Sequence, residues 1–357
     1  MDSSTRATEL TDLDELGSFL VEGFHAPPGS AFARAETLRW KYFDPQGGAD
    51  PPQPRSWLRR SEGRIVAHVG LSLTEFQVVG AGAVREGPRT LHMMDWLADP
   101  AYPSAGARLM LLAERGVPTQ YGLGGSAAGR SVIAGHGYEL IGSVPLFALI
   151  TRPASWLRAR EGDFAGRLAR CGRDAVRLWT SGLGRSVGRV RWRPVSSFAE
   201  SDPDAIGPEQ LLARFPEPVL TTRRDAALLD HLLRCPAANA EITGGYLEID
   251  GDRRGFALLS RLTRGRLRIG KLVECWLDTP DTGLLRDAIR LLVGQLRQEN
   301  VDLIEAYGGS RWRDEALRLA GFRLVDHLDL RVRDRDRLLA RELPIHLSPI
   351  EADYAFS

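Results

Sequence analysis

Four side chains of types that carry acid–base or nucleophilic chemistry lie near the middle of the first half of the chain. His92 and Asp95 stand on one largely apolar stretch that we predict to be a strand, Ser126 follows on a glycine-rich turn, and His136 comes ten residues later. Histidine and carboxylate groups exchange protons near neutral pH, and a serine hydroxyl both donates and accepts hydrogen bonds. These four residues are therefore the candidate catalytic residues.

The remaining motifs argue against several other chemistries. Ser126 does not stand in a Gly-x-Ser-x-Gly turn, and the sequence has no His-Glu-x-x-His, Cys-x-x-Cys or Gly-x-x-x-x-Gly-Lys motif. Residues 122–129 fit a Gly-x-Gly-x-x-Ala dinucleotide pattern, but the helix after them has room for only a few residues before Gly135. Hydrolase and dinucleotide-dependent chemistry are thus disfavoured, and we expect no metal ion.

The composition describes a well-packed protein without a strong overall charge. Of its 357 residues 43% are hydrophobic, and 47 basic residues against 46 acidic ones leave a net charge of +1. The length predicts two domains, and the small net charge provides no general attraction to DNA or anionic lipid. Three scattered cysteines, the lack of a signal-peptide pattern at the start and the shortness of every apolar run predict a cytoplasmic protein without a membrane span.

A divergent internal repeat organises the two halves. Trp-Leu-Ala-Asp-Pro at 96–100 opens a pattern of turn, helix, strand, Gly-Ser turn, helix and a closing Gly-Tyr pair at 137–138. Trp-Leu-Asp-Thr-Pro at 276–280 opens the same pattern, which closes with Gly-Phe at 321–322. The distance from the tryptophan to the closing aromatic residue is 42 residues in the first copy and 46 in the second. Such agreement predicts two copies of one architecture.

Strands with antiparallel hairpin turns precede each copy, so each half is predicted to be a mixed, mostly antiparallel sheet flanked by helices. The fold class is α/β (α+β), with an N-terminal domain over residues 1–151 and a C-terminal domain over 194–357. Residues 152–193 carry 11 arginines against 3 acidic residues, with apolar side chains at helical spacing. We expect this segment to be a basic, amphipathic linker helix.

In this order of elements the chain resembles the GNAT superfamily of acyl-CoA-dependent N-acyltransferases, twice in tandem. The residues that carry the resemblance are the hairpin strand 63–71, the strand-turn-helix 96–111 and the closing turn 134–138. It covers most of each half outside the linker. The resemblance implies two GNAT-like domains, an N-acyltransferase activity, and acetyl-CoA or a longer acyl-CoA as the donor.

The resemblance also implies where the donor binds. The family's phosphate loop, Gln/Arg-x-x-Gly-x-Gly/Ala, falls on residues 102–107, where small side chains let the pyrophosphate approach a helix N-terminus. The preceding strand of the family carries a bulge that opens a gap for the pantetheine arm. The expected donor-binding residues are Leu97, Ala98, Pro103, Ser104, Ala105, Gly106, Ala107 and Arg108.

The second copy departs from this loop pattern. Leu285 replaces the second small residue, and Asp278 and Asp281 add negative charge where a phosphate would bind. We expect the C-terminal half not to bind the donor and to form part of an acceptor cleft between the halves.

The usual catalytic acid is missing from both copies. Many members place a tyrosine about four residues before the closing Gly-aromatic pair, and Ile133 and Leu317 stand there instead. Asp95 or His92 could instead deprotonate an acceptor amine. His68 on the hairpin strand is interpreted as a packed or rim histidine.

Several alternatives stay open. The acceptor is expected to be a small-molecule or peptide amine. Residues 67–71 and 114–118 are similar to nodulation-factor N-acyltransferases, so the donor could be an acyl carrier protein instead of acyl-CoA. A non-catalytic tandem GNAT binding or scaffold protein is a second hypothesis. A third is an aminoacyl-tRNA-dependent transferase whose basic linker contacts RNA.

Overall fold

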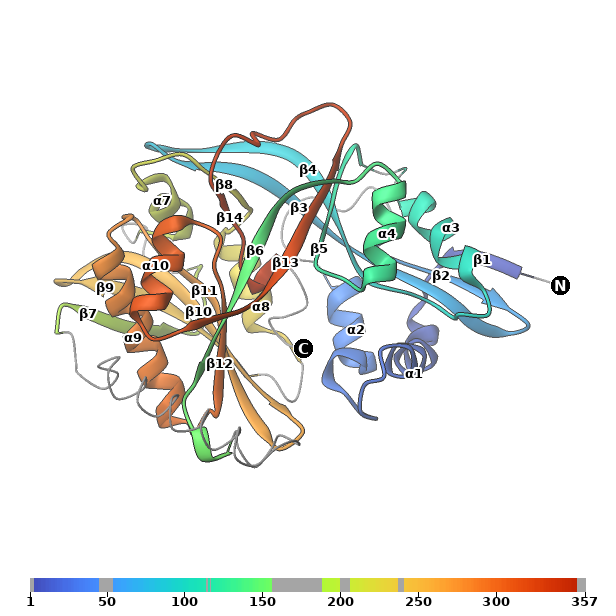
Figure 1. Cartoon of the computed structure of the whole chain (residues 1–357), viewed down its shortest axis with the longest axis horizontal. Helices are drawn as coiled ribbons and strands as arrows, with labels where there is room; N and C mark the ends of the chain where they lie inside the picture. Colours follow the sequence, from blue (N-terminus) through green and yellow to red (C-terminus); the bar gives the residue numbers. More distant parts are fainter. Residues whose placement is uncertain are drawn as a thin grey trace.

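One 14-stranded sheet runs through both halves of the chain, with helices on its two faces (Figure 1). The computed structural model describes residues 3–44, 54–113, 115, 117–155, 188–199, 206–236 and 241–351. In that part of the chain no helix is long and apolar enough to cross a membrane.

The N-terminal half, up to residue 150, contains six strands and four α-helices among the described residues. They are β1 (Ser3–Ala7), α1 (Leu13–Gly23), α2 (Ala35–Tyr42), β2 (Ser56–Ser61), β3 (Arg64–Gly80), β4 (Ala83–Ala98), α3 (Pro103–Ala113), β5 (Thr119–Leu123), α4 (Ala127–Gly135) and β6 (Glu139–Ile150).

The C-terminal half, from residue 190, repeats this order and adds two short strands, β8 and β14. Its elements are β7 (Val190–Val195), α7 (Pro208–Ala213), β8 (Val219–Thr222), α8 (Ala226–Leu233), β9 (Glu241–Ile249), β10 (Asp252–Arg264), β11 (Leu267–Leu277), α9 (Thr282–Gln298), β12 (Leu303–Tyr307), α10 (Arg311–Leu319), β13 (Arg323–Asp334) and β14 (Ile345–His346).

The strand order confirms the repeat that the sequence predicts. The main path reads β1-β2-β3-β4-β5-β13-β6-β12-β11-β10-β9-β7, which is symmetric about its central pair, β13 and β6. Each strand of the first half has its counterpart at the same distance from the centre. The ring of Trp40 on α2 lies 4.6 Å from that of His231 on α8. Because α2 and α8 have the same place in the element order of the two halves, the two copies meet at equivalent helices.

The two halves exchange their last strands. β13 of the C-terminal half pairs with β5, and β6 of the N-terminal half pairs with β12. The sequence predicts a sheet for each half, but the structure joins them into one because each completes the other's edge. Residues 190–193, expected in the linker helix, belong to β7. Residues 156–187 of that expected helix lie outside the described residues, and the domain boundaries stay a prediction.

Side-chain alternation along the strands distributes the core between two layers of helices. On β10, Phe256 and Leu258 pack with α7 and α8, whereas Ala257 and Leu259 pack with α9 and α10. Successive residues of a strand point to opposite faces, so the apolar run 256–259 of β10 serves both layers. In the N-terminal half, α3 and α4 cover one face of the sheet, and α1 and α2 cover the other.

Candidate functional site

A bulge on β4 separates that strand from β5. His68 of β3 pairs with Leu97 and Gly70 pairs with Met94, so two residues of β4, Asp95 and Trp96, face a single residue of β3. Asp95 has a φ of 47°, and such a left-handed residue bends the strand. β4 pairs with β5 only from Thr90 to His92 and diverges beyond. We call the space beyond His92 the β4–β5 opening; it contains the bulge that the resemblance implies.

The start of α3 lies at the end of β4, as a phosphate-binding loop requires. Pro103, Ser104 and Arg108 are exposed and Ala107 is half-buried. The Ala105 side chain is buried in the core, and its amide donates to Tyr102 O at 2.9 Å. Among the expected loop residues, Ser104, Ala107 and Arg108 are therefore the ones that an anion at this helix end could contact.

Asp95 is the centre of a buried polar cluster on the face covered by α1 and α2. Lys41 Nζ lies 2.9 Å from Asp95 Oδ2, and the Tyr42 hydroxyl donates to the same oxygen at 2.5 Å. The Asp95 side chain is 8% exposed and that of Lys41 is 2% exposed. Burial alone raises the pKa of Asp95, but the Lys41 charge and the Tyr42 hydrogen bond outweigh burial and lower it. Asp95 is therefore an anion held beside the bulge.

A chain of hydrogen bonds supports the bulge from β3. His68 Nδ1 lies 2.9 Å from the Asp95 carbonyl oxygen, which only accepts, so Nδ1 carries the proton. His68 Nε2 then accepts from the Ser56 hydroxyl at 2.9 Å, and Ser56 accepts from Thr8 at 2.6 Å. Burial lowers the pKa of His68 to about 4 and keeps it neutral. His68 is thus a packed histidine that positions the backbone of Asp95.

His92 lies on the same face but makes no hydrogen bond through Nδ1 within the described part of the chain. Its ring stacks on Tyr121 with 4.5 Å between centroids, and burial lowers its pKa to about 4. His92 is neutral and 4% exposed. This environment favours packing over proton transfer.

Ser126 and His136 lie at opposite ends of α4. The Ser126 hydroxyl accepts a hydrogen bond from Gly129 N at 3.1 Å and caps the helix. His136 is the C-cap residue nine positions after the helix begins. The structure therefore groups Asp95 and His92 on β4 and leaves the other two candidates apart from them, so the four do not form one catalytic set.

In the C-terminal half, the corresponding opening between β11 and β12 is closed by Arg313. This side chain of α10 is 1% exposed. It donates through Nε to Tyr307 O on β12 at 2.7 Å and through a terminal nitrogen to Cys275 O on β11 at 2.6 Å. The guanidinium thus occupies backbone acceptors that a bound pantetheine arm would need.

Glu274 fixes this guanidinium in place. Its carboxylate lies 3.6 Å from Arg313, 2.8 Å from Arg224 Nε and 3.1 Å from His346 Nε2. Burial raises the pKa of Glu274, but His346 and the two arginines lower it well below its usual value. Residues 273–277 are all buried, whereas residues 93–98 of β4 are all partly exposed. The two copies therefore differ where a donor would bind.

Sequence reasoning missed Lys41, Tyr42 and Arg313. A signal for Lys41 was present: the chain has only two lysines, Lys41 and Lys271, and the structure buries both beside carboxylates. Nothing in the local sequence around Arg313 distinguishes it from the chain's many exposed arginines.

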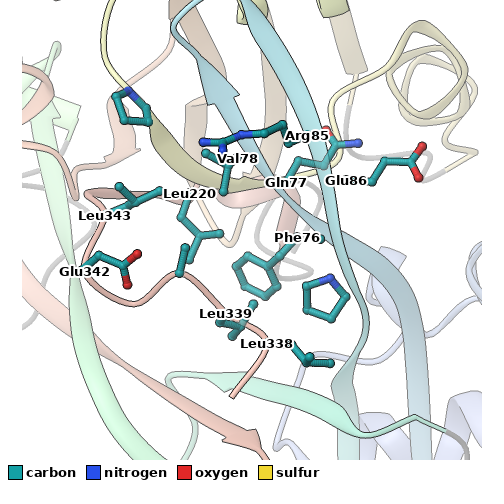
Figure 2. A pocket seen from close by; sticks show the side chains of 14 residues that line it. Phe76, Gln77, Val78, Arg85, Glu86, Leu220, Leu338, Leu339, Glu342 and Leu343 are labelled. Carbon is teal, nitrogen blue, oxygen red and sulfur yellow. The ribbon is translucent and has the colours of Figure 1, made fainter. Parts of the chain in front are cut away.

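A cavity of 330 Å³ lies between the halves at the far end of β4 (Figure 2). Phe76, Leu220 and Leu339 form apolar walls, and Arg85 and Glu342 contribute charged groups to its lining. Asp95 lies seven positions after Pro88 of the cavity lining on the same strand, about 23 Å at 3.3 Å per residue. The cavity is therefore too remote to hold the reacting end of a small molecule bound at the bulge.

Among the described residues no group of three or more His, Cys, Asp or Glu side chains has the arrangement of a metal site.

Comparison with known proteins supports the fold. No protein-family model and no curated protein matches the sequence. N-myristoyltransferase of Saccharomyces cerevisiae with bound myristoyl-CoA is similar in structure at a TM-score of 0.62 and 12% identity, over 93% of this chain and 82% of that one. A GCN5-related N-acetyltransferase from Anabaena variabilis is similar at a TM-score of 0.56 and 12% identity, over 93% and 72%.

A tandem GNAT protein from the clavulanic acid biosynthesis pathway is similar over 93% of this chain and 98% of its own, at a TM-score of 0.54 and 13% identity. These likenesses confirm the expected fold, two GNAT-like halves in tandem. The similarity of the first half to nodulation-factor N-acyltransferases stays a prediction, because none of these three structures is of that kind.

Proposed function

We propose that this protein is an N-acyltransferase that takes an acyl group from acyl-CoA bound in the N-terminal half and transfers it to an amine. The observation that carries the proposal is the contrast between the two copies: β4 diverges from β5 beyond His92 with residues 93–98 partly exposed, whereas Arg313 closes the corresponding opening. The fold shared with acyltransferases, including one with bound myristoyl-CoA, supports the same reading.

In this proposal the donor extends along the free edge of β4. The pantetheine arm hydrogen-bonds to the backbone at Leu97 and Ala98, as an added strand does. The pyrophosphate lies at the start of α3, against the Ser104 amide and the Arg108 side chain, where the helix dipole favours negative charge. The C-terminal half contributes no second donor site.

The thioester then lies beside the bulge, and the acceptor amine approaches on the Asp95 face. The amine nitrogen attacks the thioester carbonyl carbon, a C–N bond forms, the C–S bond breaks and sulfur leaves as a thiolate. Asp95, acting through the Tyr42 hydroxyl bonded to it, accepts the proton that the nitrogen loses. Because the pKa of Asp95 is lowered, the carboxylate is a weak base that passes this proton to the thiolate.

A calorimetric titration with coenzyme A, acetyl-CoA and a long-chain acyl-CoA tests the donor site. Ser104→Asp places a negative charge at the exposed start of α3, where it stabilises the helix and repels a pyrophosphate. Thr282→Asp makes a similar change at the start of α9 and is the matched control. We expect Ser104→Asp to weaken binding about ten-fold or more and Thr282→Asp to leave it unchanged.

The acceptor is then sought by thiol release from acyl-CoA in the presence of small amines and peptides with free N-termini. Absence of binding for all three donor compounds would remove the acyl-CoA proposal and leave a carrier-protein donor or a non-catalytic role.

A non-catalytic tandem GNAT binding protein is the second candidate. Ile133 and Leu317, which stand where the family usually has tyrosine, are 6% and 0% exposed and belong to the apolar cores. Donor binding without thiol release for any amine would favour this candidate. The cytoplasmic location expected from the sequence stays a prediction.

A further inference from the structure

The Trp96 side chain bridges α3 and α4 above the β4–β5 opening. Its Nε1 donates a hydrogen bond to Gly106 O of α3 at 3.0 Å. A Cβ atom added to Gly106 would lie 3.3 Å from Trp96 Nε1, and one added to Gly129 of α4 would lie 3.9 Å from Trp96 Cζ3. The indole therefore touches the glycines of both helices, and both helices lack a side chain at the point of contact.

The ring fills space that a donor in this opening needs. Beyond His92 the free edge of β4 faces β5, and α3 and α4 cover the same face of both strands. A donor that extends along the free edge of β4 from the start of α3 to Asp95 passes Trp96, which stands between Asp95 and Leu97 on that strand. Trp96 packs there with Met93 against Met110, Ile133 and Tyr138, yet it stays partly exposed.

Trp276, the tryptophan that aligns with Trp96 in the second copy, packs against different helices. Trp276 packs in the core beneath α7 and α8, with its ring 5.1 Å from Phe215. On β11 the extra residue is Val273, three positions before Trp276, whereas on β4 Trp96 itself is one of the two residues that face Val69. Trp96 packs with α3 and α4, whereas Trp276 packs on the opposite face of the sheet, with α7 and α8, which correspond to α1 and α2.

We propose that Trp96 controls entry of the acyl donor: its indole closes the passage between α3 and α4 in the free protein, and the donor enters by displacing it. This inference rests on the proposed function. Displacement breaks a single hydrogen bond to Gly106 O and moves a ring that already reaches solvent. Arg313, by contrast, is buried and bonded to two strands, so its opening stays shut.

Two variants and one matched control test the inference by calorimetric titration with coenzyme A. Trp96→Phe removes the hydrogen bond and keeps a ring, and Trp96→Ala removes the ring. Trp57→Phe is the control, because Trp57 Nε1 also donates to a backbone carbonyl, Pro54 O at 3.1 Å, and Trp57 stands on β2, which β3 separates from β4. We expect about five-fold tighter binding for Trp96→Phe, still tighter binding for Trp96→Ala, and no change for Trp57→Phe.

Tryptophan fluorescence provides a second readout on the same proteins. Coenzyme A should change the emission of the wild type and of Trp57→Phe, and should change that of Trp96→Phe much less. Equal or weaker binding by both Trp96 variants would overturn the inference while leaving the donor site intact. If neither wild type nor Trp96→Ala binds coenzyme A, the proposed function itself fails.

Discussion

Removal of the Arg313 guanidinium should be among the most destabilising single changes in the C-terminal half. The side chain is 1% exposed and donates to Cys275 O and Tyr307 O. Arg313→Ala removes both of these buried hydrogen bonds, at about 1–3 kcal/mol each, and removes a cation 3.6 Å from buried Glu274. Arg224 still neutralises Glu274, so we expect a loss of about 4 kcal/mol in the free energy of unfolding.

Two further variants separate the causes of this loss. Arg313→Met fills much of the same volume without hydrogen bonds and should lose nearly as much as Arg313→Ala if the hydrogen bonds dominate. Arg318→Ala makes the same change on the same helix, at a side chain 56% exposed whose ion pair with Asp314 spans 4.0 Å. Such exposed pairs contribute below about 1 kcal/mol.

Urea unfolding followed by tryptophan fluorescence measures the three variants against the wild type, with the free energy taken from the midpoint and slope. A loss for Arg313→Ala no larger than that for Arg318→Ala would refute the reasoning. The guanidinium would then not hold β11 and β12 together, and the β11–β12 opening would have to be considered a donor site as well.

Three other perturbations test the Asp95 face. Asp95→Asn should lower the rate of thiol release by about 100-fold or more at saturating donor while coenzyme A binding, measured by calorimetry, stays within about two-fold. Gly70→Ala places a Cβ 2.3 Å from the Tyr42 hydroxyl oxygen, so it should cost about 2 kcal/mol in urea unfolding and slow the same reaction. His92 has a pKa of about 4 in the fold against 6.5 unfolded, so between these values the unfolded state binds more protons and stability falls as pH falls. From pH 7 to pH 5 this amounts to about 2 kcal/mol, and His92→Phe, which keeps a ring against Tyr121, should remove that share of the pH dependence while preserving thiol release.

Much of the architecture was predictable because local patterns define it. The alternation of apolar residues, the Pro and Gly turns and the repeat spacing indicated strand, helix, strand and helix in both halves, and the structure has that order twice. α3 starts at Pro103, within the expected loop at 102–107. Asp95 was recognisable as a carboxylate in an apolar strand, where a buried charge requires a partner.

The partners of Asp95 were not predictable in the same way. Lys41 and Tyr42 lie on a helix more than fifty residues earlier, and only the packing of α2 against β3 and β4 brings them to the carboxylate. Ser126 illustrates the opposite error. Its position before a helix is typical of an N-cap, and the structure uses its hydroxyl to cap α4.

Residue order and periodicity thus specify which segments of this chain become strands and helices, and that they occur twice. Which helix layer a strand's side chains pack against, and which strands pair along their edges, is decided by the tertiary structure. Trp96 and Trp276 align in sequence, yet strand pairing places Trp96 against α3 and α4 and Trp276 in the other helix layer, against α7 and α8. Likewise, β6 pairs with β12 of the C-terminal half, and β13 pairs with β5 of the N-terminal half. The backbone N–H and C=O groups of an unpaired strand edge bond to whichever strand packs beside it, however far away that strand is in the sequence.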